Sequence, residues 1–209
     1  MIDRRTALIV ALCWPVASRM VFAQSQAKPH KIGILGASTR EATQAFEEVF
    51  IRRLRELGHA EGTNLVIERR YSGSDNMLLP ALARELVGRE VEVIFAPATP
   101  AALAARTASR TIPIVFATAA DPVGVGLVES LARPNGNATG LSSVNVELIG
   151  KRLSLLKELV PKAARMGILC NPANPPDALQ IRDASAAAKA LGIAVQAVRA
   201  TAEADYAQA

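Results

Sequence analysis

The chain is poor in the side chains that form disulfides and bind metals. Its 209 residues include two cysteines and two histidines. Cys13 lies in an apolar run at the N-terminus, so removal of that run leaves Cys170 alone and excludes an intramolecular disulfide. His30 and His59 are expected in a linker and in a turn after a helix, without a cluster of metal ligands around them. We therefore expect no metal site.

Aromatic residues and basic blocks are also scarce. Aromatic side chains make up 4% of the chain, and three of the arginines behind its net charge of +5 lie within residues 1–23. The other basic residues are scattered. A nucleic-acid-binding face would gather Lys and Arg against phosphates, so we expect no nucleic-acid partner.

Catalytic and cofactor-binding motifs are missing as well. The chain contains neither a Gly-x-Ser-x-Gly elbow nor a Walker loop. Gly33 and Gly36 lack the third glycine and the spacing of a dinucleotide fingerprint. Asp121 has no evident histidine partner. The sequence therefore favours a protein without catalytic residues or a cofactor.

The N-terminus of the sequence has the pattern of an export signal. Arginines at 4–5 precede an apolar run over 7–17, and small residues at 21 and 23 have the spacing that a signal peptidase reads. The run is shorter than the about 20 residues that span a bilayer. We predict a signal peptide over 1–23, no stable membrane insertion after its cleavage, and a linker over 24–30. The arginine pair leaves the ordinary secretory route and the twin-arginine route both open.

From residue 31 the sequence alternates apolar, strand-like runs with amphipathic stretches. Strands are expected at 31–36, 64–71, 91–96, 113–118 and 138–142, and helices at 41–57, 76–87, 101–109 and around 125–131. Spacing of three and four residues gives the first helix an inward face of Ala42, Ala45, Phe46, Val49, Phe50, Leu54 and Leu57. The alternation predicts an α/β lobe over 31–143, with a doubly wound parallel sheet of right-handed βαβ units.

The pattern restarts after residue 143. A helix is expected at 146–160, then a strand at 166–170, a helix at 176–191 and a strand at 193–198. Two strands and one complete helix cannot cover both faces of a parallel sheet. We therefore expect residues 144–209 to form an incomplete, truncated second α/β lobe rather than to extend the first sheet.

Short hydroxyl and amide side chains follow the predicted strands. Open parallel sheets bind ligands beyond the carboxyl ends of their strands, and hydroxyls with helix N-terminal N–H groups suit a carboxylate or another small anion. Each residue alone is also explained as a helix cap or turn former, so the prediction depends on their convergence at one rim. The candidate ligand-binding residues are Ser38, Thr39, Thr99, Thr118, Asp121, Asn171 and Asn174. Asp121 is the candidate partner of an ammonium group.

A series of short motifs resembles one family. It includes Lys31-Ile-Gly-Ile-Leu35, Ala98-Thr-Pro-Ala-Ala-Leu103, Asp121-Pro-Val-Gly124 and Asn171-Pro-Ala-Asn-Pro175. Each motif is weak alone, but in this order behind an export signal the set is specific. From about residue 30 to its end, the chain resembles the substrate-binding proteins of bacterial ABC transporters of the tryptophan/tyrosine type.

The resemblance implies a periplasmic-binding-protein-like fold, in which a ligand cleft lies between two lobes. It also implies a periplasmic receptor that captures a small polar ligand, an amino acid or a related carboxylate, for an inner-membrane ABC permease. Members of the family continue beyond this C-terminus, so a C-terminally truncated chain is expected.

Three other interpretations stay open. An exported α/β enzyme would use Asp121 as an acid or base. The sensor domain of a transcription repressor shares the two-lobed fold, although the leader stands where a helix-turn-helix would be required. The last is a non-functional, truncated gene product.

Overall fold

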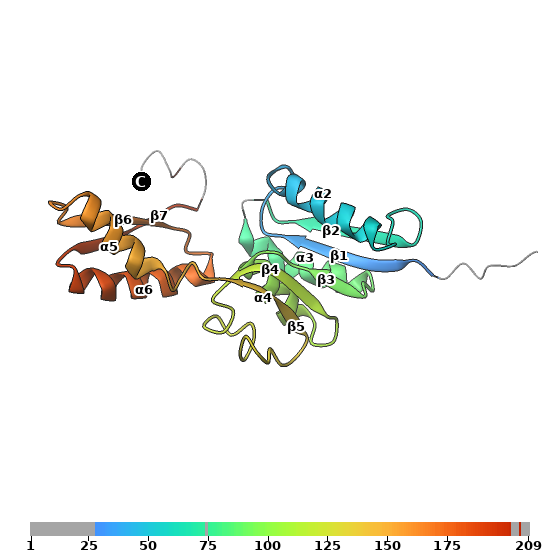
Figure 1. Ribbon diagram of the computed structural model, residues 1–209. Helices are drawn as coiled ribbons and strands as arrows, with labels where there is room; N and C mark the ends of the chain where they lie inside the picture. The colour runs from blue at the N-terminus through green and yellow to red at the C-terminus, as the bar shows by residue number, and fades with distance from the viewer. Residues whose placement is uncertain (1–27, 74, 202–204, 206–209) are drawn as a thin grey trace, which may run out of the picture.

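The computed structural model of the protein describes residues 28–73, 75–201 and 205. The predicted signal peptide and most of the predicted linker lie outside this range. Figure 1 shows two α/β lobes, joined by the segment between strand β5 (Ala138–Ser143) and helix α5 (Ile149–Leu159). Within the described range, no helix is long and apolar enough to cross a lipid bilayer.

A five-stranded sheet forms the first lobe. Its strands are β1 (His30–Gly36), β2 (Leu65–Tyr71), β3 (Val93–Phe95), β4 (Ile114–Ala120) and β5. They lie in the order β2-β1-β3-β4-β5, and every pair of neighbours is parallel. The doubly wound parallel sheet predicted from the sequence is therefore confirmed. The order reverses between β1 and β3, and such a reversal leaves a crevice at the carboxyl edge of the sheet.

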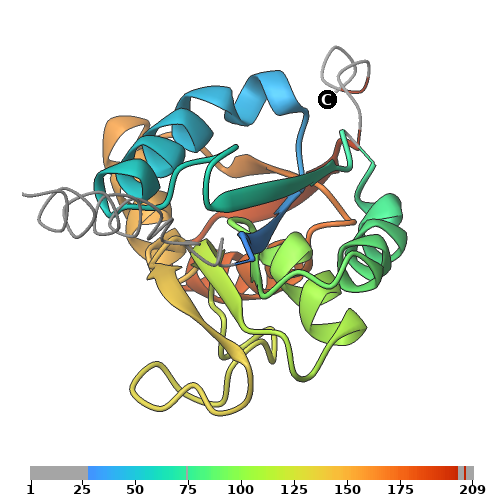
Figure 2. The same cartoon turned by 90° about the vertical axis from the view of Figure 1, so that its right-hand side faces the viewer.

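Helices cover the two faces of this sheet unequally. Helices α3 (Leu79–Gly88) and α4 (Thr99–Ala108) lie on one face, and α2 (Arg40–Glu56) lies on the other (Figure 2). The α3 and α4 face carries the larger core, to which α4 contributes the buried residues Ala101, Ala102, Ala104 and Ala105. On the α2 face, the rings of Phe50 and Phe95 stack with centroids 4.4 Å apart.

Helix α2 buries a narrower face than its periodicity predicts. Phe50 and Leu54 pack toward the sheet, whereas Phe46 is 81% exposed and Val49 and Leu57 are also exposed. Glu47 turns toward the edge strand β2 instead, where it contacts two side chains. Because Glu47 points inward, its neighbour Phe46 is rotated toward solvent. Five of the seven residues predicted to face inward are exposed, and the prediction is wrong for them: Ala42, Ala45, Phe46, Val49 and Leu57.

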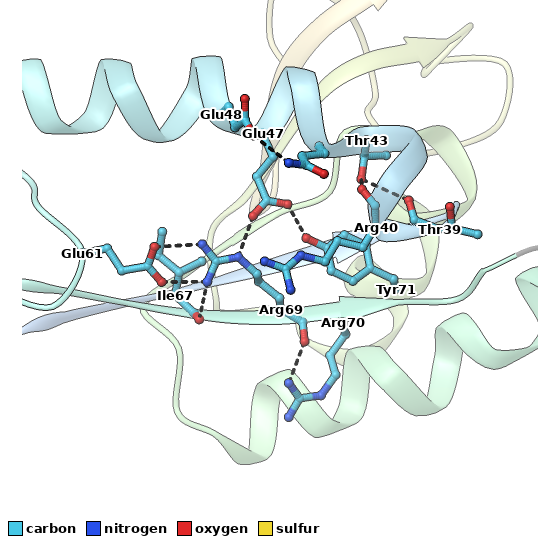
Figure 3. A network of polar contacts seen from close by, with 11 residues as sticks. Thr39, Arg40, Thr43, Glu47, Glu48, Glu61, Ile67, Arg69, Arg70 and Tyr71 are labelled. Atoms are coloured by element: carbon cyan, nitrogen blue, oxygen red, sulfur yellow. Dashed lines mark hydrogen bonds and ion pairs between the residues drawn. The ribbon is translucent and has the colours of Figure 1, made fainter.

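A polar network holds α2 against β2 (Figure 3). Arg69 donates from Nε to Glu47 at 2.5 Å, and from its two terminal nitrogens to Glu61 at 2.7 and 2.9 Å. The hydroxyl of Tyr71 donates to the second oxygen of Glu47. The hydrogen bonds from Arg69 lower the pKa of Glu61, and Glu61 in turn raises the pKa of Arg69. The side chains of Glu47 and Arg69 are only 11% and 21% exposed, so solvent screens their contact less than that of a surface pair.

The connection between β4 and β5 is built from turns. The helix predicted around 125–131 is absent there, and this prediction is wrong. Gly126 has a φ of +71°, a left-handed conformation that does not continue an α-helix. Leu127 and Val128 are nevertheless buried, and Arg106 of α4 donates to the carbonyls of Gly126 and Leu127. The spacing of apolar residues therefore predicted the burial of Leu127 and Val128 correctly, but it predicted the wrong backbone conformation.

The second lobe has its own sheet. Strands β6 (Arg165–Cys170) and β7 (Ala194–Arg199) pair in parallel and do not join the first sheet. Helices α5 and α6 (Pro175–Ala190) pack on them around Leu153, Ala184 and Ala188. The second, incomplete α/β lobe expected from the sequence is thus present, with two strands in the part of the chain that the structure describes.

We predict that Glu47→Ala lowers the free energy of unfolding by about 1–3 kcal/mol, because it leaves Tyr71 unpaired and Arg69 with one carboxylate. The matched control is Glu56→Ala on the same helix, which removes an exposed i,i+3 pair with Arg53. That pair contributes about 0–1 kcal/mol. Urea unfolding measures both variants, and equal losses would show that the network adds no stability beyond a surface pair.

A second prediction concerns alkaline pH. Burial, followed by the hydrogen bond to Glu47, raises the pKa of Tyr71 from 10.0 to about 12. The folded state therefore holds this proton more tightly, so the stabilisation is complete below pH 10 and is lost as pH rises toward 12. Urea unfolding of the wild type and Tyr71→Phe across this interval should show the difference between them shrinking. A constant difference would contradict the assignment.

Candidate functional site

A cavity of about 370 Å³ lies between the two lobes, at the carboxyl edge of the first sheet. Its lining residues have no charged side chain. The first lobe contributes the polar side chains of Asn76, Thr99 and Thr118. Ser143, the last residue of β5, also lines it, and the connection and the second lobe contribute Asn145, Asn171, Asn174 and Gln180. Hydroxyls and amides from several loops therefore converge on one neutral cavity, completed by methyl groups and prolines.

Two threonines fix the wall from the first lobe. The N–H and the hydroxyl of Thr118 both donate to the carbonyl of Pro97 at 2.9 Å. The hydroxyl oxygen of Thr99 accepts the N–H of Ala120 at 2.9 Å. These bonds join the end of β4 to the start of α4. Thr99 is 4% exposed, so its position is set by the protein around it.

The start of α4 faces the same cavity. Thr99 and Pro100 both line it, and they are the first two residues of the helix. The N–H groups in the first turn of a helix have no acceptor within that helix. They carry a partial positive charge that favours anions. Pro100 has no N–H, so the N–H of Thr99 is the backbone donor that the lining residues of α4 offer to the cavity.

An aspartate that the sequence reasoning missed holds the wall from the second lobe. One oxygen of Asp177 accepts the N–H of Asn171 at 2.7 Å, and the other accepts from the side-chain amide of Asn174 at 2.6 Å. Asn171 closes its own turn, since its side-chain oxygen accepts the N–H of Ala173 at 2.9 Å. An acidic residue three positions after a helix N-cap resembles a capping box, and this signal could have indicated Asp177.

The structure brings together four of the seven predicted residues. Thr99, Thr118, Asn171 and Asn174 line the cavity, whereas Ser38, Thr39 and Asp121 do not. Ser38 follows directly after Ala37, which does line it. The hydroxyl of Thr39 caps α2 instead, where it accepts the N–H of Ala42 at 3.3 Å.

Asp121 lies in a turn after β4. It has a φ of +44°, and its carboxylate accepts the N–H of Gly124 at 2.8 Å. Its charge also acts on the second lobe. The hydrogen bond to Asp183 and, to a smaller extent, the charge of Asp121 raise the pKa of Arg182. Its suggested contact with an ammonium group stays a prediction.

Residues 28–73, 75–201 and 205 form no candidate metal site. Nowhere in these ranges do three His, Cys, Asp or Glu side chains gather in a way that could hold a metal ion.

A smaller cavity, of about 340 Å³, lies beside the polar network of α2 and β2, where Arg40 and Glu48 are among its lining residues. It differs from the interlobe cavity in being lined by charged side chains.

Comparison with known proteins gives a consistent family. The family described as ABC transporter substrate binding protein matches residues 31–209. A tyrosine-binding protein of Clostridioides difficile is 32% identical over 154 residues, which cover 74% of this chain and 44% of that protein.

Solved structures share the fold. A conserved domain protein from Vibrio cholerae has a TM-score of 0.77 and 30% identity, with 87% of this chain and 61% of that chain covered. An ABC domain from Streptococcus pneumoniae, solved in complex with L-Trp, has a TM-score of 0.74 and 25% identity, with 87% and 60% covered. The chain thus spans less than two thirds of the length of these relatives. From the family match and the shared fold, we conclude that the chain belongs to the ABC transporter substrate-binding protein family.

Proposed function

We propose that this chain is an extracytoplasmic receptor that binds a small polar ligand, an amino acid or a related carboxylate, in the interlobe cavity. One observation carries the proposal: threonine and asparagine side chains from both lobes line one neutral cavity at the carboxyl edge of the first sheet. Two relatives add support, since one is named for tyrosine binding and another was solved with L-Trp.

The chemistry of the cavity suits capture without reaction. Its volume of about 370 Å³ lies in the usual range of small-molecule sites. Hydroxyl and amide groups orient a ligand through hydrogen bonds, and alanine and proline side chains contact its apolar body. The carboxylate of Asp121 accepts the N–H of Gly124 within its own turn. This contact suits a structural role better than that of a catalytic acid or base.

The family and the predicted export signal support an extracytoplasmic setting for the receptor. An export signal over 1–23 would place the mature receptor in the periplasm, and its partner would be an ABC permease of the inner membrane. The family match supports a transporter partner.

The first test of this function is ligand-dependent stability. L-tyrosine and L-tryptophan are the probes, with glucose as a control compound. A ligand at one hundred times its Kd stabilises the folded state by about 2.7 kcal/mol, so at least one of the two amino acids should raise Tm in a concentration-dependent way. If neither amino acid changes Tm more than glucose does, binding of L-tyrosine and L-tryptophan by this chain is excluded.

A second test removes one hydroxyl of the cavity wall. Thr118→Val should weaken amino-acid binding about threefold to tenfold, because the oxygen of Thr118 has no donor among the described residues and is open to the ligand. Thr43→Val is the matched control, since the hydroxyl of Thr43 also donates to a backbone carbonyl but lies on α2. Calorimetric titration measures both. Equal Kd values for Thr118→Val and the control would remove Thr118 from the site.

A further inference from the structure

Building on the proposed function, we propose that Asn174 accepts a hydrogen bond from the ammonium group of the ligand, and that Asp177 is the positioning residue for Asn174. The carboxylate of the ligand then lies between the start of α4 and the side-chain amide of Asn171. The cavity therefore fixes the direction in which an amino acid binds.

The orientation of the Asn174 side chain follows from its partner. A carboxylate accepts hydrogen bonds and cannot donate them. The 2.6 Å contact with Asp177 thus requires the NH₂ group of Asn174 to face Asp177, which turns its carbonyl oxygen the other way. No donor to that oxygen is found among the residues that the structure describes. Since Asn174 lines the cavity, it presents an acceptor to the ligand.

The first turn of α6 supports the same direction. Helix N-termini usually offer free N–H groups to anions. In α6 the first two residues, Pro175 and Pro176, have no N–H, and the N–H of Asp177 donates to the carbonyl of Asn174 at 3.0 Å. The first three residues of α6 therefore have no free N–H group that could donate to a carboxylate.

Donors gather instead at α4 and at Asn171. The oxygen of Thr99 accepts from Ala120, so its hydroxyl proton is left for an acceptor on the ligand. The N–H of Thr99 belongs to the first residue of α4, which lines the cavity, and it has no acceptor within the helix. Asn171 turns its side-chain oxygen to Ala173, which leaves its NH₂ group for the cavity. A carboxylate is matched by these groups.

The carboxylate of Asp177 accepts a hydrogen bond from Asn174, and Asn174 itself lines the cavity. Hydrogen bonds in a chain polarise one another, so the charge of Asp177 strengthens the acceptor oxygen of Asn174. A hydrogen bond from an ammonium group to that oxygen is charge-assisted and stronger than a neutral one. The pair thus recognises an amine although the wall itself carries no charge.

The experiment compares amino acids with analogues that lack the amino group. Calorimetric titration gives Kd for L-tyrosine and 3-(4-hydroxyphenyl)propionate, and for L-tryptophan and indole-3-propionate. The wild type should prefer the amino acid. Asn174→Ala and Asp177→Asn should each reduce this preference about tenfold, because a hydrogen bond to a charged group is lost or weakened. The matched control is Asp183→Asn, which alters the carboxylate of α6 that pairs with Arg182 and should leave the preference unchanged.

The outcomes separate this inference from the proposed function. If both variants weaken an amino acid and its analogue by the same factor, their role is structural and the inference is overturned while the receptor function stands. A wild type that binds both members of each pair equally has the same consequence. Absence of binding by all four compounds overturns the assignment of aromatic amino acids as ligands of the proposed receptor, and the inference with it.

Discussion

Two threonines hold the end of β4 against the start of α4, and the rest of the candidate site depends on this contact. Thr118 donates twice to the carbonyl of Pro97, and Thr99 accepts from Ala120. Loops that follow different strands are thereby joined into one wall. Because Thr99 is held in place before any ligand arrives, binding does not have to order it, and this lowers the entropic cost of binding.

Local patterns predicted the sheet well, since β3 is apolar toward both of its faces and β2 alternates as an edge strand does. They failed where a distant partner decided the conformation. Glu47 and Arg69 lie 22 residues apart, and no window of helical periodicity shows that this pair turns Phe46 outward. The turns around Gly126 failed for another reason: buried apolar residues occur in turns as well as in helices, and only the backbone angle distinguishes them.

The site was predictable to the extent that sheet topology dictates it. Residues after strands had to meet at the carboxyl edge, which is why Thr99, Thr118, Asn171 and Asn174 converge there. Thr39 followed the same rule but caps its own helix. Asp177 escaped prediction because its partners are groups of a loop that folds back over the start of α6.

The two walls of the cavity are built on different sheets and present different groups to a ligand. The wall at α4 belongs to a five-stranded sheet whose core contains fully buried Ile94 and Ile114. Among the described residues, the other wall belongs to a two-stranded sheet with a smaller core. There the side chain of Asn174 is oriented by the carboxylate of Asp177, and that of Asn171 by the N–H of Ala173. The donors of the first wall define where an anion lies whatever the ligand. Selection among carboxylates therefore falls to the second wall, where Asp177 determines whether an acceptor or a donor of Asn174 meets the ligand.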